Sequence, residues 1–269
     1  MKDKKVLYVS SEVLPYLPPS EMSTTSFEAA RKAHHKGVQT RIFMPRYGVI
    51  NERRYQLHEV IRLSGMNLIV NDMDMPLIIK VASIPKERMQ VYFIDNEEYF
   101  KRKGTVKDSN SELFSDNDER AIFFAKGVIE TVKKLNWAPD IIHVHGWMAS
   151  LLPLYLKEYY KDDPLFAESK IVTSLYKEDF EGALNSELIN KVKFDNISEE
   201  KVEVLKDPSH MNILKSAIEN SDGVIQATEE LSAELTDFIT AQNKPILEFQ
   251  PEETFADAYL DFYANEILN

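Results

Sequence analysis

Short apolar runs alternate with segments of helical spacing along most of the chain. Residues 5–11 and 38–45 are runs rich in β-branched and aromatic residues, which indicates two strands. Between them, residues 23–36 have the spacing of a helix, with Ser23 or Thr24 as the candidate N-cap. Because a strand, a helix and a strand follow one another, this part of the chain predicts neighbouring parallel strands.

The pattern changes in the middle of the chain. Residues 57–95 contain several strand-like runs separated by turn residues, which predicts a hairpin-rich insertion before the chain returns to the main sheet. Residues 97–117 are polar and charged, and we expect a surface loop there. Residues 118–136 have the 3-4 spacing of an amphipathic helix, in which Gly127 costs about 1 kcal/mol relative to alanine.

The alternation continues beyond this helix, with strands expected at 139–145, 170–175 and 222–228 and helices at 148–160, 210–220 and 229–240. An aromatic-rich amphipathic helix is expected over 251–268, where Pro251 and two glutamates begin the segment. This order of elements is typical of an α/β fold with a doubly wound parallel sheet. We therefore predict one domain over residues 1–250 and a C-terminal helix over 251–269 that packs back on it.

The composition excludes several classes of partner and site. The 269 residues carry a net charge of −12, which argues against nucleic acid and against an anionic membrane surface as partners. There is no cysteine, so disulfides and thiolate sites are excluded. The apolar run near the N-terminus soon reaches Glu12, which makes it a poor signal peptide. No apolar run is long enough to span a bilayer, and we therefore expect a cytoplasmic protein.

Glycine usage argues against the common nucleotide-binding loops. The eight glycines are scattered, and neither GxGxxG nor a P-loop occurs. No metal-spaced cluster stands out, and we expect neither a metal nor another cofactor.

The strand ends hold the candidate ligand-binding residues, because doubly wound sheets bind ligands beyond the carboxyl ends of their strands. His143 and His145 are two apart on one strand and share a face. His145 is nearest the strand end and is either a ligand-binding group or a buried, satisfied histidine. Trp147 is either a platform for a sugar or a core residue, and the sequence leaves both alternatives open.

Two other segments carry polar groups that are candidates for ligand binding. Asp116 opens the segment DNDER, which either holds a polyol through its carboxylates or starts a helix with Asn117 or Asp118 as the cap. Arg46 and Tyr47, in the segment PRYG, are explained either as binders of an anion or a sugar or as a surface turn.

Six segments, in order over about residues 5–235, resemble the N-terminal, acceptor-side domain of bacterial glycogen and starch synthases; they are KVLYVSSEVLPY, RIFMPRYGVI, VYFIDNEEYFKRKG, DNDERAIFFAKGVIE, PDIIHVHGWMASLLPLYLK and NILKSAIENSDGVIQATEELSAEL. Glycogen and starch synthases are GT-B glycosyltransferases that transfer glucose from ADP-glucose to an α-1,4-glucan. The resemblance implies a Rossmann-like single domain of the GT-B N-terminal type. It also implies that His145 takes the position of the active-site histidine and Asp116 that of a cleft aspartate.

The chain departs from the family at the loop after the first strand. Where the family carries Lys-Thr-Gly-Gly to hold the donor's diphosphate, this sequence has Pro18, Pro19, Ser20 and Glu21. Proline lacks the backbone N–H donor, and the glutamate adds negative charge where an anion would sit.

Further departures affect the other strand ends. The carboxylate that follows the family's histidine is replaced by Gly146, and the family's His-Asn strand end has become Leu175-Tyr176. Little chain follows residue 240, so we expect that the family's donor domain is absent.

The preferred hypothesis is a glycogen/starch-synthase-like domain that does not transfer glucose alone and acts as a glucan-binding or regulatory module. It would bind α-glucan or maltooligosaccharide through Arg46, Tyr47 and Trp147. One alternative is an active glycosyltransferase completed by a partner chain that supplies the donor domain. Another is a protein-interaction scaffold in which a partner protein or a second copy of the chain covers the cleft. Whether the chain is an enzyme stays open at this point.

Overall fold

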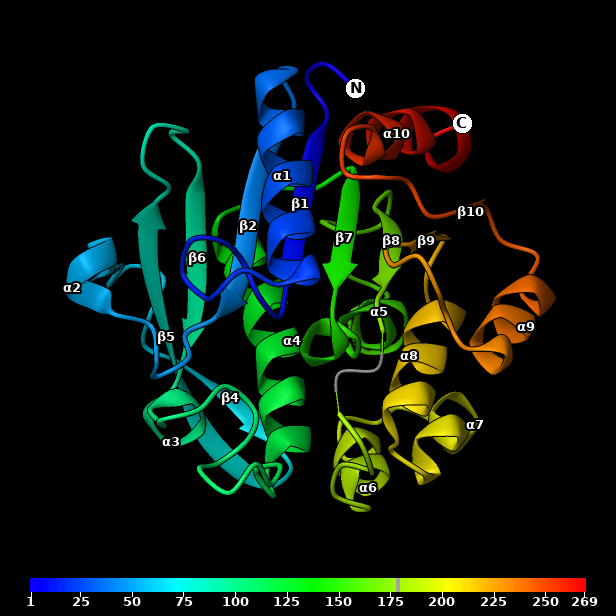
Figure 1. Ribbon diagram of the computed structural model, residues 1–269. Helices are drawn as coiled ribbons and strands as arrows, with labels where there is room; N and C mark the ends of the chain where they lie inside the picture. Colours follow the sequence, from blue (N-terminus) through cyan, green and yellow to red (C-terminus); the bar gives the residue numbers. More distant parts are fainter. Residues whose placement is uncertain (178–179) are drawn as a thin grey trace.

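A ten-stranded sheet runs through the part of the chain that the structure describes, residues 1–177 and 180–269 of a computed structural model (Figure 1). Its strand order is β10-β9-β8-β7-β1-β2-β6-β5-β3, and β4 pairs with β5. The strands are β1 (Lys5–Ser10), β2 (Gln39–Pro45), β3 (His58–Glu59), β4 (Met66–Val70), β5 (Met73–Ser83), β6 (Gln90–Asp95), β7 (Ile141–His145), β8 (Lys170–Leu175), β9 (Gly223–Gln226) and β10 (Ile246–Leu247).

The predicted α/β class with a parallel sheet and a hairpin insertion is confirmed. Strands β1, β2, β6, β7, β8, β9 and β10 pair in parallel, whereas β3, β4 and β5 add antiparallel pairs at one side. At the start of the strand-like region 57–95, the strand β3 is short, and His58 and Glu59 pair with β5.

Helix α1 (Glu21–His35) begins earlier than the sequence indicated. Its N-cap is Ser20, not Ser23 or Thr24, because the Ser20 hydroxyl accepts a hydrogen bond from the Ser23 backbone N–H and the Ser23 hydroxyl accepts one from the Ser20 backbone N–H. This capping box satisfies two backbone N–H groups that the first turn of a helix leaves free. The prediction missed the cap because it placed residues 18–21 in a loop.

Helix α4 (Asn117–Lys134) lies on the face of the sheet opposite α1. Its N-cap is Asp116, not Asn117 or Asp118, and no side chain caps its first turn. Gly127 lies against β6, and a Cβ there would come within 2.8 Å of Ile94 Cγ2. The glycine therefore permits a close approach of helix and sheet that its low helix propensity alone did not suggest.

The remaining helical elements are α2 (Glu52–Tyr55), α3 (Glu97–Phe100), η1 (Trp147–Ala149), α5 (Leu152–Leu154), η2 (Tyr155–Tyr159), α6 (Leu188–Lys193), α7 (Glu199–Val202), η3 (Glu203–Lys206), α8 (His210–Glu219), α9 (Ala233–Ala241), α10 (Phe255–Phe262) and η4 (Tyr263–Ile267). The expectation of a plain surface loop over 97–117 was wrong. Tyr99 and Phe100 of α3 are buried, because their rings pack against Phe123 of α4.

The C-terminal helix lies beside α1 on one face of the sheet (Figure 1). It begins at Phe255, about one turn later than the predicted start at Pro251. Lys32 Nζ of α1 pairs with Asp257 at 2.9 Å, and Phe262 and Ile267 pack on Gly223, where a Cβ would lie 2.3 Å from Ile267 Cδ1. Within the described residues, no helix has the length and apolar character needed to cross a bilayer.

Candidate functional site

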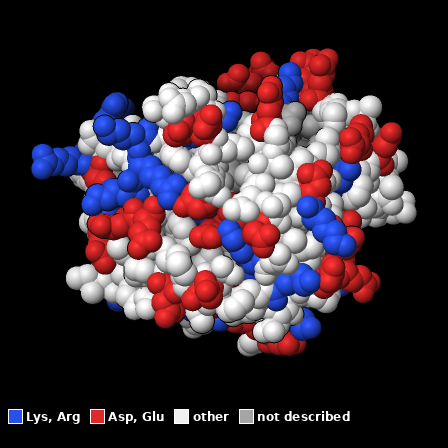
Figure 2. Space-filling view, turned by 90° about the horizontal axis from the view of Figure 1, so that it is seen from below, with Lys and Arg blue, Asp and Glu red and all other residues white. Residues whose placement is uncertain are grey.

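The carboxyl end of β1 marks the place where the direction of strand order reverses, since β2 and β7 flank β1 on either side. Doubly wound sheets bind ligands at this position. Figure 2 views the molecule from the side on which the arrow of β7 ends in Figure 1. Lys and Arg side chains gather there on the side of α2 and α3, and acidic side chains are spread along the rest of the rim.

His143 is buried in the middle of β7 and is held on both ring nitrogens. Its Nε2 lies 2.7 Å from Ser174 Oγ, and its Nδ1 lies 2.6 Å from Tyr263 Oη at the C-terminal helix. Complete burial, reinforced by the neighbouring His145 ring, holds the pKa of His143 well below its usual value. The side chain is therefore a neutral link between the sheet and the C-terminal segment.

His145 stands at the end of β7 and is also completely buried. Its Nδ1 lies 2.7 Å from Tyr176 Oη, and its ring centroid lies 3.9 Å from that of His143. Burial lowers the pKa of His145 to about 3, so the ring is neutral at physiological pH. Its Nε2 has no hydrogen-bond partner. This nitrogen is the one polar atom of the ring left for another molecule, and in this conformation solvent does not reach it.

The residues after β7 are packed as closely. Trp147 is 1% exposed, and the edge of its ring system meets Phe180 with centroids 5.0 Å apart, so the indole lies in the core. Gly146 has φ +82°, and a Cβ there would come within 2.5 Å of Met22 Sδ and Ser11 Oγ. A side chain at this position, including the family's carboxylate, does not fit without displacing those neighbours.

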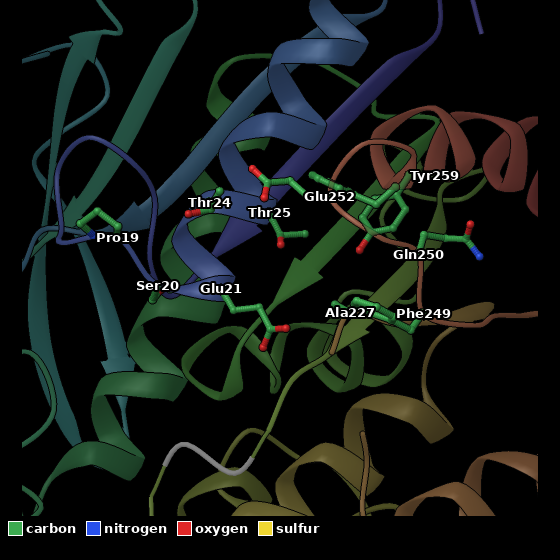
Figure 3. Close-up of a pocket in the computed structure, with 11 residues that line it drawn as sticks. Pro19, Ser20, Glu21, Thr24, Thr25, Ala227, Phe249, Gln250, Glu252 and Tyr259 are labelled. Atoms are coloured by element: carbon green, nitrogen blue, oxygen red, sulfur yellow. The ribbon is translucent and has the colours of Figure 1, made fainter. Parts of the chain in front are cut away.

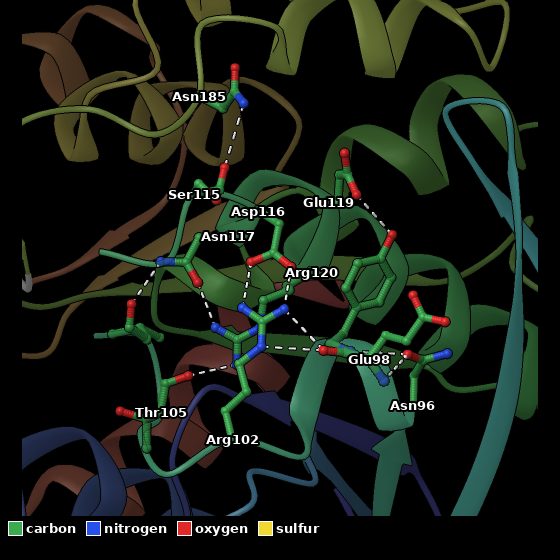
Figure 4. A network of polar contacts seen from close by, with 12 residues as sticks. Asn96, Glu98, Arg102, Thr105, Ser115, Asp116, Asn117, Glu119, Arg120 and Asn185 are labelled. Carbon is green, nitrogen blue, oxygen red and sulfur yellow. Dashed lines mark hydrogen bonds and ion pairs between the residues drawn. The ribbon is translucent and has the colours of Figure 1, made fainter. Parts of the chain in front are cut away.

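Asp116 is held by Arg102 at the start of α4 (Figure 4). The guanidinium contacts both carboxylate oxygens, with Arg102 Nη1 2.7 Å from Asp116 Oδ1. The two side chains are 24% and 27% exposed, so the pair lies at the rim rather than in the interior.

Arg120, which the sequence did not single out, organises the surroundings of this pair. It is completely buried, donates to Asn117 Oδ1 and donates to the Thr105 carbonyl at 2.6 Å. Burial lowers its pKa to about 10, and its guanidinium lies over the rings of Phe100 and Phe114. No ion pair with a carboxylate holds this guanidinium within the described residues, so its burial depends on these hydrogen bonds and ring contacts. The only sequence signal was its place in DNDER.

Arg46 and Tyr47 are both engaged within the protein. Arg46 donates to Glu52, with Nε at 2.6 Å from Oε1, and Lys80 Nζ lies 2.7 Å from the same oxygen. Tyr47 is 1% exposed and meets the edge of Phe100. The structure thus brings Tyr47 and Asp116 into one region around Arg120, whose guanidinium lies 5.9 Å from the centre of the Tyr47 ring and interacts with the charge of Asp116.

Pro18, Pro19, Ser20 and Glu21 form the corner that leads into α1. Ser20 serves as the helix cap and donates to Glu12 Oε2 at 2.6 Å, and Glu21 is an acid in the first turn, where the helix dipole favours it. This corner borders a pocket of about 520 Å³ between α1 and the C-terminal segment (Figure 3).

The pocket is lined by Pro19, Ser20, Glu21, Thr24, Thr25, Ala227, Phe249, Gln250, Glu252, Phe255 and Tyr259. No lysine or arginine is among these residues, and two are glutamates. The sequence did not indicate the contribution of residues 249–259. The aromatic spacing of the last helix was its only signal. No group of three or more histidine, aspartate or glutamate side chains suited to a metal occurs in the described parts of the chain.

The chain is similar in sequence to known proteins of one family. Residues 5–243 match the model of a family described as the starch synthase catalytic domain. The chain is 36% identical over 235 residues to a glycogen synthase of Chlorobium luteolum and 36% identical over 231 residues to one of Chlorobium limicola. These matches cover 87% and 86% of this chain but 47% and 46% of the two relatives.

A solved structure has a similar fold. It is the catalytic domain of starch synthase IV from Arabidopsis thaliana bound to ADP and acarbose, with a TM-score of 0.75 and 16% sequence identity. The superposition covers 92% of this chain and 51% of that one. The chain thus spans about half the length of the proteins that it matches.

Proposed function

The chain belongs to the starch synthase catalytic-domain family of glycogen and starch synthases, and on this premise we propose that it binds α-glucan and does not by itself transfer glucose. The observation that carries the proposal is the pocket beside the Pro18–Glu21 corner, whose lining in the described part of the chain has two carboxylates and no lysine or arginine. The similar starch synthase IV was solved with ADP and acarbose, and of these two ligands we retain only the saccharide type for this chain.

Electrostatics support the loss of donor binding. A diphosphate needs N–H donors and cations, and the two prolines supply no N–H. Two like charges 4 Å apart repel by about 1 kcal/mol in water and about 4 kcal/mol at an effective dielectric constant of 20. Glu21 and Glu252 would each oppose a diphosphate in this way, and no lining residue offsets them.

The state of His145 supports the same conclusion. A residue that assists a transfer must reach the substrate within hydrogen-bonding distance. His145 is buried, its Nδ1 is engaged by Tyr176 and the position after it admits no side chain. Transfer also requires donor and acceptor to be held in line with water excluded, and a histidine that cannot reach the substrate contributes nothing to that arrangement.

The test is a transfer assay with the purified chain. Radiolabelled ADP-glucose and a maltoheptaose primer are incubated with the protein, and incorporation into glucan is compared with a sample without protein. We expect no difference between the two. Steady elongation of the primer would contradict the proposal.

A second candidate is a glycosyltransferase completed by a partner chain. The Asp116–Arg102 pair favours it, because these charged groups remain partly exposed at the rim. Its test is the same assay after mixing with the C-terminal half of the Chlorobium luteolum glycogen synthase, which would have to restore incorporation. Self-association and a cytoplasmic location stay predictions.

A further inference from the structure

We propose that a separate pocket, at the amino end of β2, binds the carboxylate group of a small organic acid through Arg41. The end of α1, the first residues of β2 and Trp137 line this pocket, which lies at the edge of the sheet opposite the carboxyl end of β1 and close to the N-terminus in Figure 1. Its volume of about 390 Å³ is within the range of roughly 300–1,000 Å³ that small-molecule sites occupy. The pocket shares no lining residue with the one beside the Pro18–Glu21 corner, so the inference does not depend on the proposed function.

Arg41 is held by aromatic rings instead of by a carboxylate. The central carbon of its guanidinium lies 4.7 Å from the centre of the Trp137 ring system and 5.7 Å from that of the Tyr92 ring. Such contacts fix the orientation of a guanidinium through its faces and leave the N–H groups at its edge without acceptors. Among the described residues Arg41 has no hydrogen-bond or ion-pair partner, and its Nη1 is a buried donor. The guanidinium is therefore oriented in advance for an acceptor that the protein does not supply.

The positive charge of Arg41 is not compensated nearby. Burial lowers the pKa of its guanidinium, and the positive charge of Arg62 adds to this effect. No aspartate or glutamate is among the described residues that line the pocket. Asp140, which lies close to Trp137 in the sequence, is engaged by Lys4 Nζ at 2.8 Å and by the Lys5 backbone N–H. A half-buried cation without a counterion is unfavourable, and an anionic ligand relieves this cost.

A carboxylate suits the pocket better than a phosphate does. A guanidinium binds both oxygens of a carboxylate through two parallel hydrogen bonds. Among the described lining residues Arg41 is the one arginine or lysine, so it balances a single negative charge. His34 and Gly37, at the C-terminal end of the 15-residue helix α1, also border the pocket. The negative end of the helix dipole lies there and opposes a doubly charged phosphate more strongly than a singly charged carboxylate.

Thr40 gives the pocket a second group that suits a carboxylate. Its hydroxyl is buried and has no hydrogen-bond partner, and the residue lines the pocket next to Arg41 in the sequence. A hydroxyl can donate to a carboxylate oxygen, which accepts hydrogen bonds only. The two unpartnered polar groups of the pocket, Arg41 Nη1 and Thr40 Oγ1, therefore both have a use when a carboxylate is bound.

The experiment is a titration of the isotope-labelled full chain with acetate at constant ionic strength, followed through the indole N–H signals in nitrogen–proton NMR spectra. The chain has two tryptophans, of which Trp137 lies beside Arg41 and Trp147 is 1% exposed in the core beyond the other end of β7. We expect the Trp137 signal, identified by its loss in Trp137→Phe, to shift and saturate in the millimolar range while the Trp147 signal stays in place. Acetamide has nearly the same shape without the charge and should not shift either signal.

Two variants test the assigned contacts. Arg41→Gln removes the positive charge and should raise the half-saturating concentration of acetate about tenfold, and Thr40→Val removes the hydroxyl and should raise it by about threefold. The matched control is Arg53→Gln, which changes an exposed arginine of α2 outside the pocket lining and should bind acetate like the unmodified chain. Circular dichroism establishes that each variant is folded. If Arg41→Gln is not, Thr40→Val and the comparison of acetate with acetamide decide the matter.

Three results would overturn the inference, and none of them bears on glucan binding or glucose transfer. A Trp137 signal that does not saturate at hundreds of millimolar acetate means that the pocket takes no carboxylate and that Arg41 serves packing alone. Equal affinity of the unmodified chain and a folded Arg41→Gln variant places the carboxylate elsewhere. Tighter binding of inorganic phosphate than of acetate, measured in the same way, shows that the pocket prefers a doubly charged anion.

Discussion

Three buried histidines make the stability of this protein sensitive to mild acid. His143 packs against Tyr259 of α10, His145 packs against His143, and His210 of α8 is 5% exposed. Burial lowers the pKa of His145 to about 3 and that of His210 to about 4, and it lowers the pKa of His143 well below its usual value. All three rings are therefore neutral in the folded protein and become protonated when the chain unfolds at acidic pH.

The sign and size of the effect follow from proton linkage. Below a pH of about 6.5 the unfolded chain binds protons that the folded chain does not, so the free energy of unfolding falls as the pH falls. The stabilisation is complete above the unfolded pKa and is lost progressively towards the folded pKa. Between pH 7.5 and 5.5 each histidine changes the unfolding equilibrium about tenfold, which amounts to about 4 kcal/mol for the three together. This is a large part of the roughly 5–15 kcal/mol typical of a folded protein.

Urea unfolding followed by circular dichroism at the two pH values measures this loss. The variant His145→Asn places an amide near Tyr176 and removes one titrating ring. The change in the unfolding equilibrium constant between pH 7.5 and 5.5 should therefore be about tenfold smaller in this variant than in the unmodified protein. The control is His58→Asn, which replaces an exposed histidine of β3. The reasoning is refuted if the unmodified protein is equally stable at both pH values, or if His145→Asn shows the same loss as the unmodified protein.

Three further substitutions test the packing. Tyr263→Phe removes the hydroxyl 2.6 Å from the buried histidine on β7 and should lower the free energy of unfolding by about 1–3 kcal/mol, and an unchanged urea midpoint would contradict this. Gly127→Ala should lower the melting temperature despite alanine's higher helix propensity, because its Cβ would come within 2.8 Å of Ile94 Cγ2, which belongs to a branched side chain. A higher melting temperature would show that the sheet shifts to make room. Lys126→Met should lower the free energy of unfolding by about 3–5 kcal/mol, because it leaves the buried carboxylate of Asp195, which lies 2.6 Å from Lys126 Nζ, without its cation. A decrease of less than 1 kcal/mol in urea unfolding would refute this.

The periodicity of the sequence predicted most of the framework. The strand at residues 170–175 has the predicted ends, and α4 begins one residue before the predicted start and ends two residues before the predicted end. Such elements are predictable because their apolar spacing reflects one buried face or two. The cap of α1 was not predictable, because the serine that caps it follows two prolines and has the local sequence of a loop.

The site was less predictable than the fold. The sequence showed that the Pro18–Glu21 corner differs from a diphosphate loop, because this difference follows from the residue types alone. It did not show that Tyr176 and Tyr263 engage the two histidines, since these contacts join residues 31 and 120 positions apart. The part that Glu252 plays in the pocket depends on where the last helix packs, which no local pattern encodes.

The proposed function depends on the corner at the start of α1, which we expect not to accept a sugar nucleotide. Calorimetric titration of the chain with ADP-glucose tests it most directly, because binding is measured without any requirement for turnover. We expect no saturable heat up to several millimolar ligand. A saturating isotherm that is abolished when Glu21 is replaced by a bulkier residue would place the nucleotide in this corner and refute the proposal.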